Sequence, residues 1–136
     1  MAIAEMYIQG VSTRKVTSVI EELCGEGVSR EKVSQLAQKL DEELDQWRKR
    51  ELGRIIYLIV DARYEHVRVD GEVRSCALLT AFGVTDKGQR MSLGVSVSLS
   101  EAETHWRTFL RSLKDRGLRG VECITSDEHS GVKAAI

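Results

Sequence analysis

Two runs of strand-forming residues, each ending in an aspartate, limit the possible folds of this chain more than any other feature. The first run covers 55–60 and ends at Asp61, and the second covers 121–126 and ends at Asp127. Such runs favour buried strands, and an acidic residue that follows one lies where the sheet meets solvent. A carboxylate placed there stays hydrated and can point into a cleft. The two aspartates are therefore candidate ligands of a shared cation, although either could instead form a turn or cap a helix.

Residues 1 to 54 have the pattern of helices. Ser12 and Ser29 are suited to cap two helices, and Gly25 and Gly27 supply a break between them. The second helix has apolar residues at three- and four-residue spacing, which predicts one packed stripe and one solvated face. These stripe residues are Val33, Leu36, Leu40, Leu44 and Trp47. Two capped helices joined by a short turn are the minimum pattern of a helix-turn-helix.

Polar residues on these helices are candidates for DNA contacts, because Arg, Lys and Gln contact phosphates and base edges. The acidic stretch 41–45 would be repelled by DNA, so only the first turns of the second helix suit this role. The alternative is a helical element for packing or dimerisation. The candidate DNA-binding residues are Arg14, Lys15, Arg30, Lys32, Gln35, Gln38 and Lys39.

From residue 55 the pattern changes to strands. The pair Asp70-Gly71 predicts a hairpin, and 91–99 alternates so that its apolar residues face one way. Ser100 and Glu103 form a predicted capping box for a helix that Gly117 ends. The predicted fold class is α+β, with a helical module over 1–54 and a mixed sheet covered by a helix over 55–136.

The order and flanking residues of these segments resemble the Mutator-type family of DNA transposases, which are bacterial insertion-sequence transposases of the DDE type. The likeness is carried by YLIVDARYEHVRVDGEV, AFGVTDKGQRMSLGVSVSLSEAETHWRTFLRSLKDRGLRGV and ITSDEHSGVKAAI, and upstream by MYIQGVSTRKVTSVIEELCG and VSREKVSQLAQKLDEELDQWRKREL. The resemblance implies a partial RNase H-like catalytic domain that cleaves phosphodiesters and transfers strands at transposon ends.

The same resemblance implies that Asp61 and Asp127 are catalytic and hold two Mg²⁺ or Mn²⁺ ions. The family's third carboxylate, a glutamate far downstream, has no counterpart in these 136 residues. Glu128 is a poor substitute, because adjacent side chains at a strand end point apart. Arg63 and His129 flank the aspartates and could contact phosphate, orient a carboxylate or simply stay solvated.

Two other functions stay open on the sequence alone. One is another RNase H-like nuclease, such as a junction resolvase, and the other is a transposase-derived DNA-binding remnant or regulator without catalysis. The expected partners are double-stranded DNA of transposon ends and target, and further copies of the chain assembled on that DNA. With a net charge of −1, DNA contacts must come from local patches.

Cysteine usage and the absence of long apolar segments predict the compartment. Cys24, Cys76 and Cys123 are widely spaced and odd in number, which argues against a disulfide framework or a zinc site and for three core residues in a reducing environment. The sequence shows neither a secretory signal pattern nor an apolar run of membrane-spanning length. We therefore expect a cytoplasmic protein.

Overall fold

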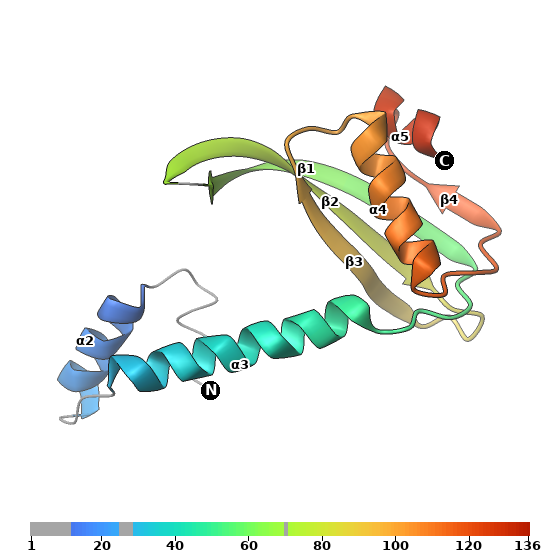
Figure 1. Cartoon of the computed structure of the whole chain (residues 1–136). Coiled ribbons are helices and arrows are strands. Elements are labelled where there is room, and N and C mark those ends of the chain that lie inside the picture. The colour runs from blue at the N-terminus through green and yellow to red at the C-terminus, as the bar shows by residue number, and fades with distance from the viewer. Residues whose placement is uncertain (1–11, 25–28, 70) are drawn as a thin grey trace. The chain divides into compact units, whose positions relative to one another are not determined.

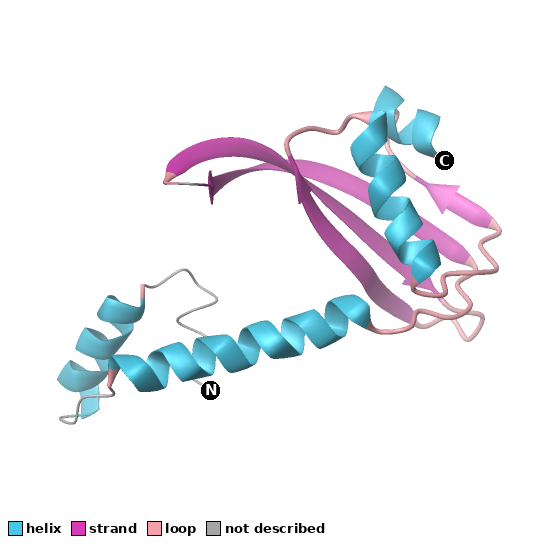
Figure 2. Cartoon of the chain, viewed as in Figure 1, coloured by secondary structure: helices cyan, strands magenta, loops and turns pink. Residues whose placement is uncertain are grey.

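The chain folds into two compact units, Met1–Lys49 and Arg50–Ile136, and the described residues form a mixed α+β structure (Figures 1 and 2). The computed structural model describes residues 12–24, 29–69 and 71–136. The elements are α2 (Thr13–Cys24), α3 (Arg30–Lys49), β1 (Tyr57–Val69), β2 (Glu72–Val84), β3 (Arg90–Ser98), α4 (Glu103–Asp115), β4 (Cys123–Thr125) and α5 (Ser130–Ala135). The predicted α+β class is confirmed.

Serine side chains begin the two described helices of the first unit, α2 and α3. Ser12 Oγ accepts a hydrogen bond from the N–H of Lys15 at 3.4 Å, and Ser29 Oγ accepts one from the N–H of Lys32 at 3.3 Å. Each bond satisfies an N–H group that has no partner within its own helix. Both predicted caps are confirmed, while Gly25 and Gly27 lie outside the described residues.

The apolar stripe of α3 is buried only in part. Val16 of α2 and Val33 of α3 are buried. Leu36 and Leu44, however, are exposed. Leu40 and Trp47 are half-buried, so the predicted stripe is packed at some of its positions and exposed at others.

The second unit contains a four-stranded sheet in the order β3-β2-β1-β4. β1 and β2 form the predicted hairpin, in which Gly71 adopts a φ of 85°, as a tight turn requires. Its turn partner Asp70 lies outside the described residues. β3 pairs antiparallel with β2, and β4 pairs parallel with β1. Both neighbours reach only the base of the hairpin, so the paired segments 65–69 and 72–76, here called the distal ribbon, project as two strands alone (Figure 1).

A β-bulge in β3 contradicts the prediction that its apolar residues share one face. Ala81 of β2 pairs with Gly94 whereas Phe82 pairs with Ser92, so Leu93 is an extra residue. Leu93 and Gly94 are both buried beneath α4. A Cβ on Gly94 would lie 3.1 Å from Leu113 Cδ2, so this close approach favours glycine. After the bulge the alternation is reversed, and Val95, Val97 and Leu99 are exposed instead of packed.

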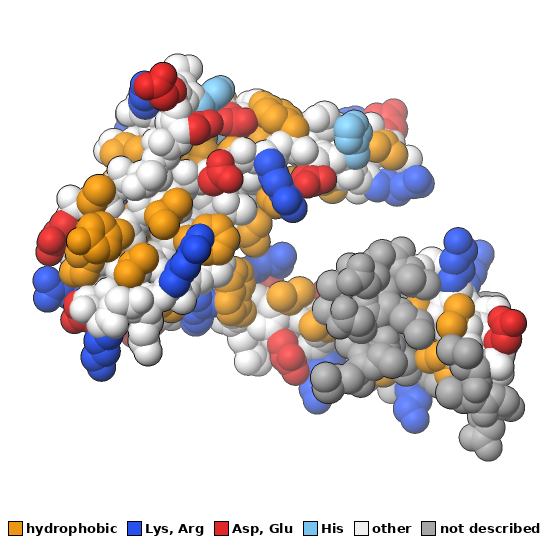
Figure 3. Space-filling view, turned by 180° about the vertical axis from the view of Figure 1, so that it is seen from behind, with side chains coloured by type: hydrophobic (Ala, Val, Ile, Leu, Met, Phe, Trp, Pro, Cys, Tyr) orange, Lys and Arg blue, Asp and Glu red, His pale blue; other side chains and the backbone are white. Residues whose placement is uncertain are grey.

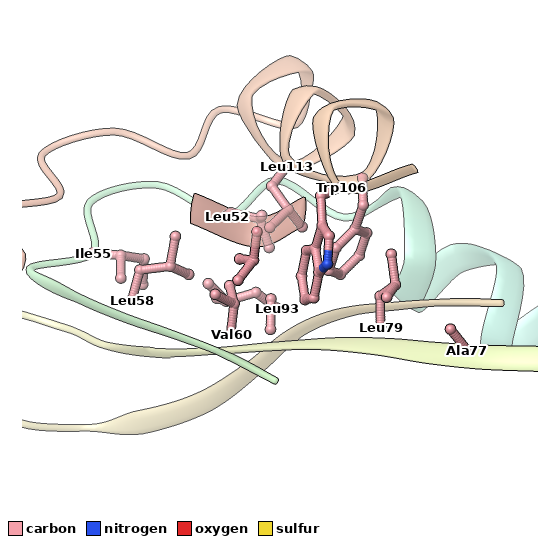
Figure 4. Close-up of a cluster of buried hydrophobic side chains, with 12 residues drawn as sticks. Leu52, Ile55, Leu58, Val60, Ala77, Leu79, Leu93, Trp106 and Leu113 are labelled. Atoms are coloured by element: carbon pink, nitrogen blue, oxygen red, sulfur yellow. The ribbon is translucent and has the colours of Figure 1, made fainter. Parts of the chain in front are cut away.

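Helix α4 covers one face of the sheet and forms the core with it. Trp106, Phe109 and Leu113 are buried, as the helical spacing predicts, and pack with Leu79 and Leu93 of the sheet (Figure 4). Burial of these side chains is the main stabilising contribution to this unit.

The two ends of α4 test different predictions. Gly117 has a φ of 85° and donates its N–H to Lys114 O at 2.9 Å, so the predicted glycine stop is confirmed. The predicted capping box is wrong, because Ala102 is the N-cap and no side chain caps the helix. Ser100 O instead lies 2.9 Å from His105 Nδ1, and Glu103 forms an ion pair with Arg107 at 2.6 Å.

Two of the three cysteines have described side chains. Cys76 is buried as predicted, whereas Cys123 is exposed, because β4 is an edge strand whose three residues are all exposed. The side chain of Cys24 lies outside the described residues.

We expect truncation of the α4 core to destabilise the second unit. Leu113→Ala should lower its free energy of unfolding by about 2–5 kcal/mol, because Leu113 is fully buried and leaves a cavity. Urea unfolding followed by Trp106 fluorescence, in a Trp47→Phe background, measures this change. The matched control Leu99→Ala, at a side chain 66% exposed, should cost less than about 0.5 kcal/mol. Equal effects of the two substitutions would contradict the described core.

Candidate metal centre and DNA-contacting residues

Asp61 and Asp127 lie at equivalent positions after the parallel ladder that β1 forms with β4. Tyr57 pairs with Cys123, and Ile59 pairs with Thr125. Asp61 and Asp127 each follow two residues after this last pair. Side chains of a strand alternate between faces, so Asp61, two residues after Ile59 within β1, lies on the same face as Ile59.

Backbone hydrogen bonds before the two strands fix this pairing. The N–H of Arg119 donates to Gly53 O at 3.1 Å, and the N–H of Ile55 donates back to Arg119 O at 2.9 Å. Farther along, the N–H of Glu122 donates to Ile56 O at 2.9 Å. The segment after α4 is therefore already aligned with the start of β1 before β4 begins.

Asp61 lies on the sheet face that α4 leaves uncovered. Leu58 and Val60 alternate with it and are buried on the α4 side. Asp61 is exposed, and its cross-strand partner is Thr80, whose Oγ1 donates a hydrogen bond to Asp61 O at 3.1 Å. Tyr57, on the same face, is 53% exposed. Seen from behind, this part of the molecule shows grouped hydrophobic side chains (Figure 3).

Asp127 lies in the loop between β4 and α5 and forms a local turn. Its Oδ1 accepts a hydrogen bond from the N–H of His129 at 3.2 Å. His129 is the N-cap of α5, and its Nδ1 accepts from the N–H of Gly131 at 3.2 Å. Asp127 therefore has the turn-forming role that the sequence offered as an alternative, while the helix cap itself is His129. The carboxylate is exposed, so this turn is compatible with binding a cation.

The residues next to the aspartates have contacts of their own. Arg63 is exposed and forms an ion pair with Glu65 at 3.1 Å, and Glu128 is 3.9 Å from Lys133. The Nδ1 of His129 lies 3.6 Å from Oε2 of Glu101, which is buried. The sequence alone does not single out Glu101, because no motif or periodicity marks it and its burial depends on α5.

A third metal ligand is not found near the two aspartates. Across residues 12–24, 29–69 and 71–136, no three His, Cys, Asp or Glu side chains gather in a way that could hold a metal ion. A groove of about 680 Å³ is lined by residues of β1, α4 and β4, including Leu58, Leu110 and Ile124. Leu58 belongs to the covered face of the sheet, so this groove is separate from Asp61.

The candidate DNA-binding residues lie on the surface of the helical unit where their side chains are described. Gln38 Nε2 also donates to Glu42 Oε1 at 3.4 Å. Arg30 is the first residue of α3, and its side chain lies outside the described residues. The exposed candidates are Arg14 and Lys15 on α2, and Lys32, Gln35, Gln38 and Lys39 on α3.

None of the described helices is long and apolar enough to cross a membrane.

Comparison with known proteins identifies the family. The whole chain, residues 1–136, matches the family described as "Transposase, Mutator family". The chain therefore belongs to the Mutator family of transposases, as the resemblance predicted.

Several insertion-sequence transposases are similar to this chain along nearly its whole length. The transposase for insertion sequence element IS406 of Burkholderia multivorans is 52% identical over 137 residues, which cover 99% of this chain and 35% of that protein. The transposase for ISRM5 of Rhizobium meliloti is 48% identical, with 98% and 34% covered. The transposase for IS256 in transposon Tn4001 of Staphylococcus aureus is 42% identical, with 97% and 34% covered. This chain thus spans about a third of the length of these relatives.

Proposed function

We propose that this chain is part of a DNA transposase. A helix-turn-helix-like module over 1–54 binds DNA, and residues 55–136 form the first part of an RNase H-like catalytic domain. The complete enzyme cleaves phosphodiester bonds at transposon ends and joins the freed 3′-OH to target DNA. The observation that carries the proposal is that Asp61 and Asp127 each follow, by two residues, the last pair of the parallel β1–β4 ladder, in a chain that belongs to a transposase family.

The two carboxylates fit a hard divalent cation. Mg²⁺ and Mn²⁺ prefer oxygen ligands, and both aspartates are exposed just beyond the residues that pair β1 with β4. Asp61 is not at a strand end, where the sequence predicts it, but lies within β1, opposite Thr80 of β2. A pair of such ions, when bound, activates the attacking oxygen and stabilises the leaving one. Two carboxylates are too few to hold two ions, so the third ligand would come from the two thirds of the relatives' length that this chain does not span.

Asp61 and Asp127 have different structural supports in this proposal. Asp61 is held by the central strand β1, which pairs with β2 along its whole length and with β4 just before the aspartate. Asp127 is held by a turn and depends on the contacts of His129. Arg63, which is exposed two residues after Asp61 on β1, is proposed to contact a phosphate of bound DNA.

The proposed partner is double-stranded DNA, both at the transposon ends and at the target. Exposed Arg, Lys and Gln side chains of α2 and of the first turns of α3 supply the contacts to phosphates and base edges. Because two transposon ends must be joined to one target, we further propose that the complete protein acts as a homo-oligomer on DNA.

Metal binding tests the paired aspartates directly. The purified chain should bind Mn²⁺, and Asp61→Asn or Asp127→Asn should each weaken that binding at least about tenfold, because each replaces a charged oxygen ligand. Titration followed by the electron paramagnetic resonance of free Mn²⁺ measures the affinity. Asp86→Asn, in the exposed turn between β2 and β3, is the matched control and should leave it unchanged. Wild-type affinity in the Asp61→Asn variant would refute the site.

We expect this polypeptide alone to be catalytically inactive. With two of three carboxylates, it cannot hold two metal ions in the arrangement that transition-state stabilisation needs. The assay combines the purified chain, Mg²⁺ or Mn²⁺ and transposon-end DNA, with Asp61→Ala to reveal contaminating nuclease. Cleavage that disappears in Asp61→Ala would contradict this expectation and direct the search for a third ligand to Glu65, Glu72 and Glu128.

The helical unit should bind DNA through counterion release. Lys32→Glu combined with Lys39→Glu should weaken binding, and the slope of log K against log salt concentration should become shallower by about 0.9 for each phosphate that the variant no longer neutralises. Fluorescence anisotropy at several salt concentrations measures both quantities. Lys87→Glu, in an exposed turn of the second unit, is the control with the same kind of charge reversal. An unchanged slope in a folded double variant would favour a packing role for these helices.

A further inference from the structure

We propose that one face of the distal ribbon binds the phosphate backbone of double-stranded DNA. This face, here called the ribbon surface, consists of Tyr64 at the base of the ribbon and of His66, Arg68, Val73 and Ser75. It rests on the proposed function for the identity of its partner. It adds a contact surface that belongs neither to the helical unit nor to the candidate metal centre.

The register of the hairpin sorts the charges of the distal ribbon onto two faces. Val60 faces α4, and the alternation of side chains along β1 places His66 and Arg68 on the same side. Their partners on β2 are Ser75 and Val73, which are uncharged. The ribbon surface therefore carries a cation and an imidazole but no carboxylate.

The acidic residues of the distal ribbon lie on the opposite face and already have partners. Glu65 Oε1 is 3.1 Å from Arg63 Nε, and Glu72 Oε2 is 2.9 Å from Arg74 Nη2. Arg68, in contrast, forms no ion pair with a residue that the structure describes. Positive and negative charges are thus balanced on the opposite face, whereas the positive charge of the ribbon surface is available to an external anion.

The ribbon surface is open to a partner. Tyr64 is 55% exposed and Val73 is 59% exposed, so α4 does not cover this part of the hairpin. The pairing of β3 with β2 ends at Ala77, and β4 pairs only near the start of β1, so the ribbon projects beyond both neighbours (Figure 1). A two-stranded ribbon on its own is only marginally stable in water, and a bound partner would supply the contacts that it lacks.

Duplex DNA fits this surface in charge and in width. A guanidinium such as that of Arg68 binds phosphate oxygens through two parallel N–H groups, and His66 and Ser75 can donate to the same backbone. The major groove, about 12 Å wide, admits a two-stranded β-ribbon. Asp61 lies on the other face of β1, so the ribbon surface contacts DNA without taking part in metal binding.

Neutralising one cation tests the contact. Arg68→Gln should weaken binding of the full chain to a fluorescein-labelled duplex of mixed sequence by about five- to tenfold at roughly 0.1 M salt. The slope of log K against log salt concentration should become shallower by about 0.9, because one phosphate contact is lost. Fluorescence anisotropy measures both quantities, and EDTA is present so that neither metal binding nor cleavage contributes.

The matched control removes the same charge from the other face of the same ribbon. Arg74→Gln should leave the slope unchanged, because its guanidinium is paired with Glu72 and points away from the ribbon surface. Thermal unfolding confirms that both variants are folded. Hydrogen exchange gives a second measurement, since added duplex should slow the amides of 65–69 and 72–76 in the wild-type chain and less so in Arg68→Gln.

Several outcomes would overturn the ribbon surface. A wild-type slope in Arg68→Gln is one, and equal changes in Arg68→Gln and Arg74→Gln are another, because they would reflect net charge alone. Self-association without DNA that Arg68→Gln abolishes, with duplex affinity unchanged, would overturn it in favour of a second copy of the chain as the partner.

Failure of the proposed function gives a different result. If the double variant Lys32→Glu with Lys39→Glu keeps the wild-type slope while Arg68→Gln does not, the ribbon surface is supported and the proposed contact of the helices is wrong. A shallower slope in the double variant alone would have the opposite meaning. A wild-type chain that binds no duplex would overturn both.

Discussion

The parallel contact between β1 and β4 is the constraint on which the arrangement of this unit depends. It is only three residue pairs long, and β4 is otherwise exposed. It holds because the segment after α4 is already hydrogen-bonded to residues 53–56 before the strand begins. The helix, its glycine stop and this short ladder together return the chain to the central strand. Any change in that register would move one aspartate relative to the other by about 3.3 Å per residue.

The two faces of the sheet have different roles: one packs the apolar core, and the other carries the candidate metal ligand Asp61. α4 buries Leu58 and Val60 on one face, where apolar contacts can be dense. Asp61 projects from the other face, where it keeps its hydration beside exposed apolar side chains such as Tyr57. A carboxylate on the covered face would have to be desolvated within the core, at a cost of several kcal/mol. The alternation of side chains along one strand therefore supplies both the core and the candidate ligand.

The fold could be predicted from the sequence wherever local chemistry decides the structure. The hairpin at Gly71, the buried face of α4 and the stop at Gly117 all follow from residue type and spacing. The bulge at Leu93 could not be predicted, because it depends on how closely α4 approaches Gly94. The burial of Glu101 likewise depends on α5, which is distant in sequence. The roles of the two aspartates and of the surface cations stay predictions, since they concern binding and not folding. The division into 1–54 and 55–136 also stays a prediction.

The distal ribbon has a mechanical consequence for Asp61. Tyr64 is the last β1 residue whose partner on β2 also pairs with β3, so the two-stranded ribbon begins only a few residues beyond Asp61. From there the strands stay paired from Glu65 with Cys76 to Val69 with Glu72, a length of roughly 15 Å at the rise of an extended strand. A continuous strand transmits twist along its length. Asp61 therefore lies close to the point about which the distal ribbon would bend relative to the rest of the sheet. A contact at the tip of the ribbon would therefore twist the strand that carries Asp61, whereas Asp127 lies on a separate loop.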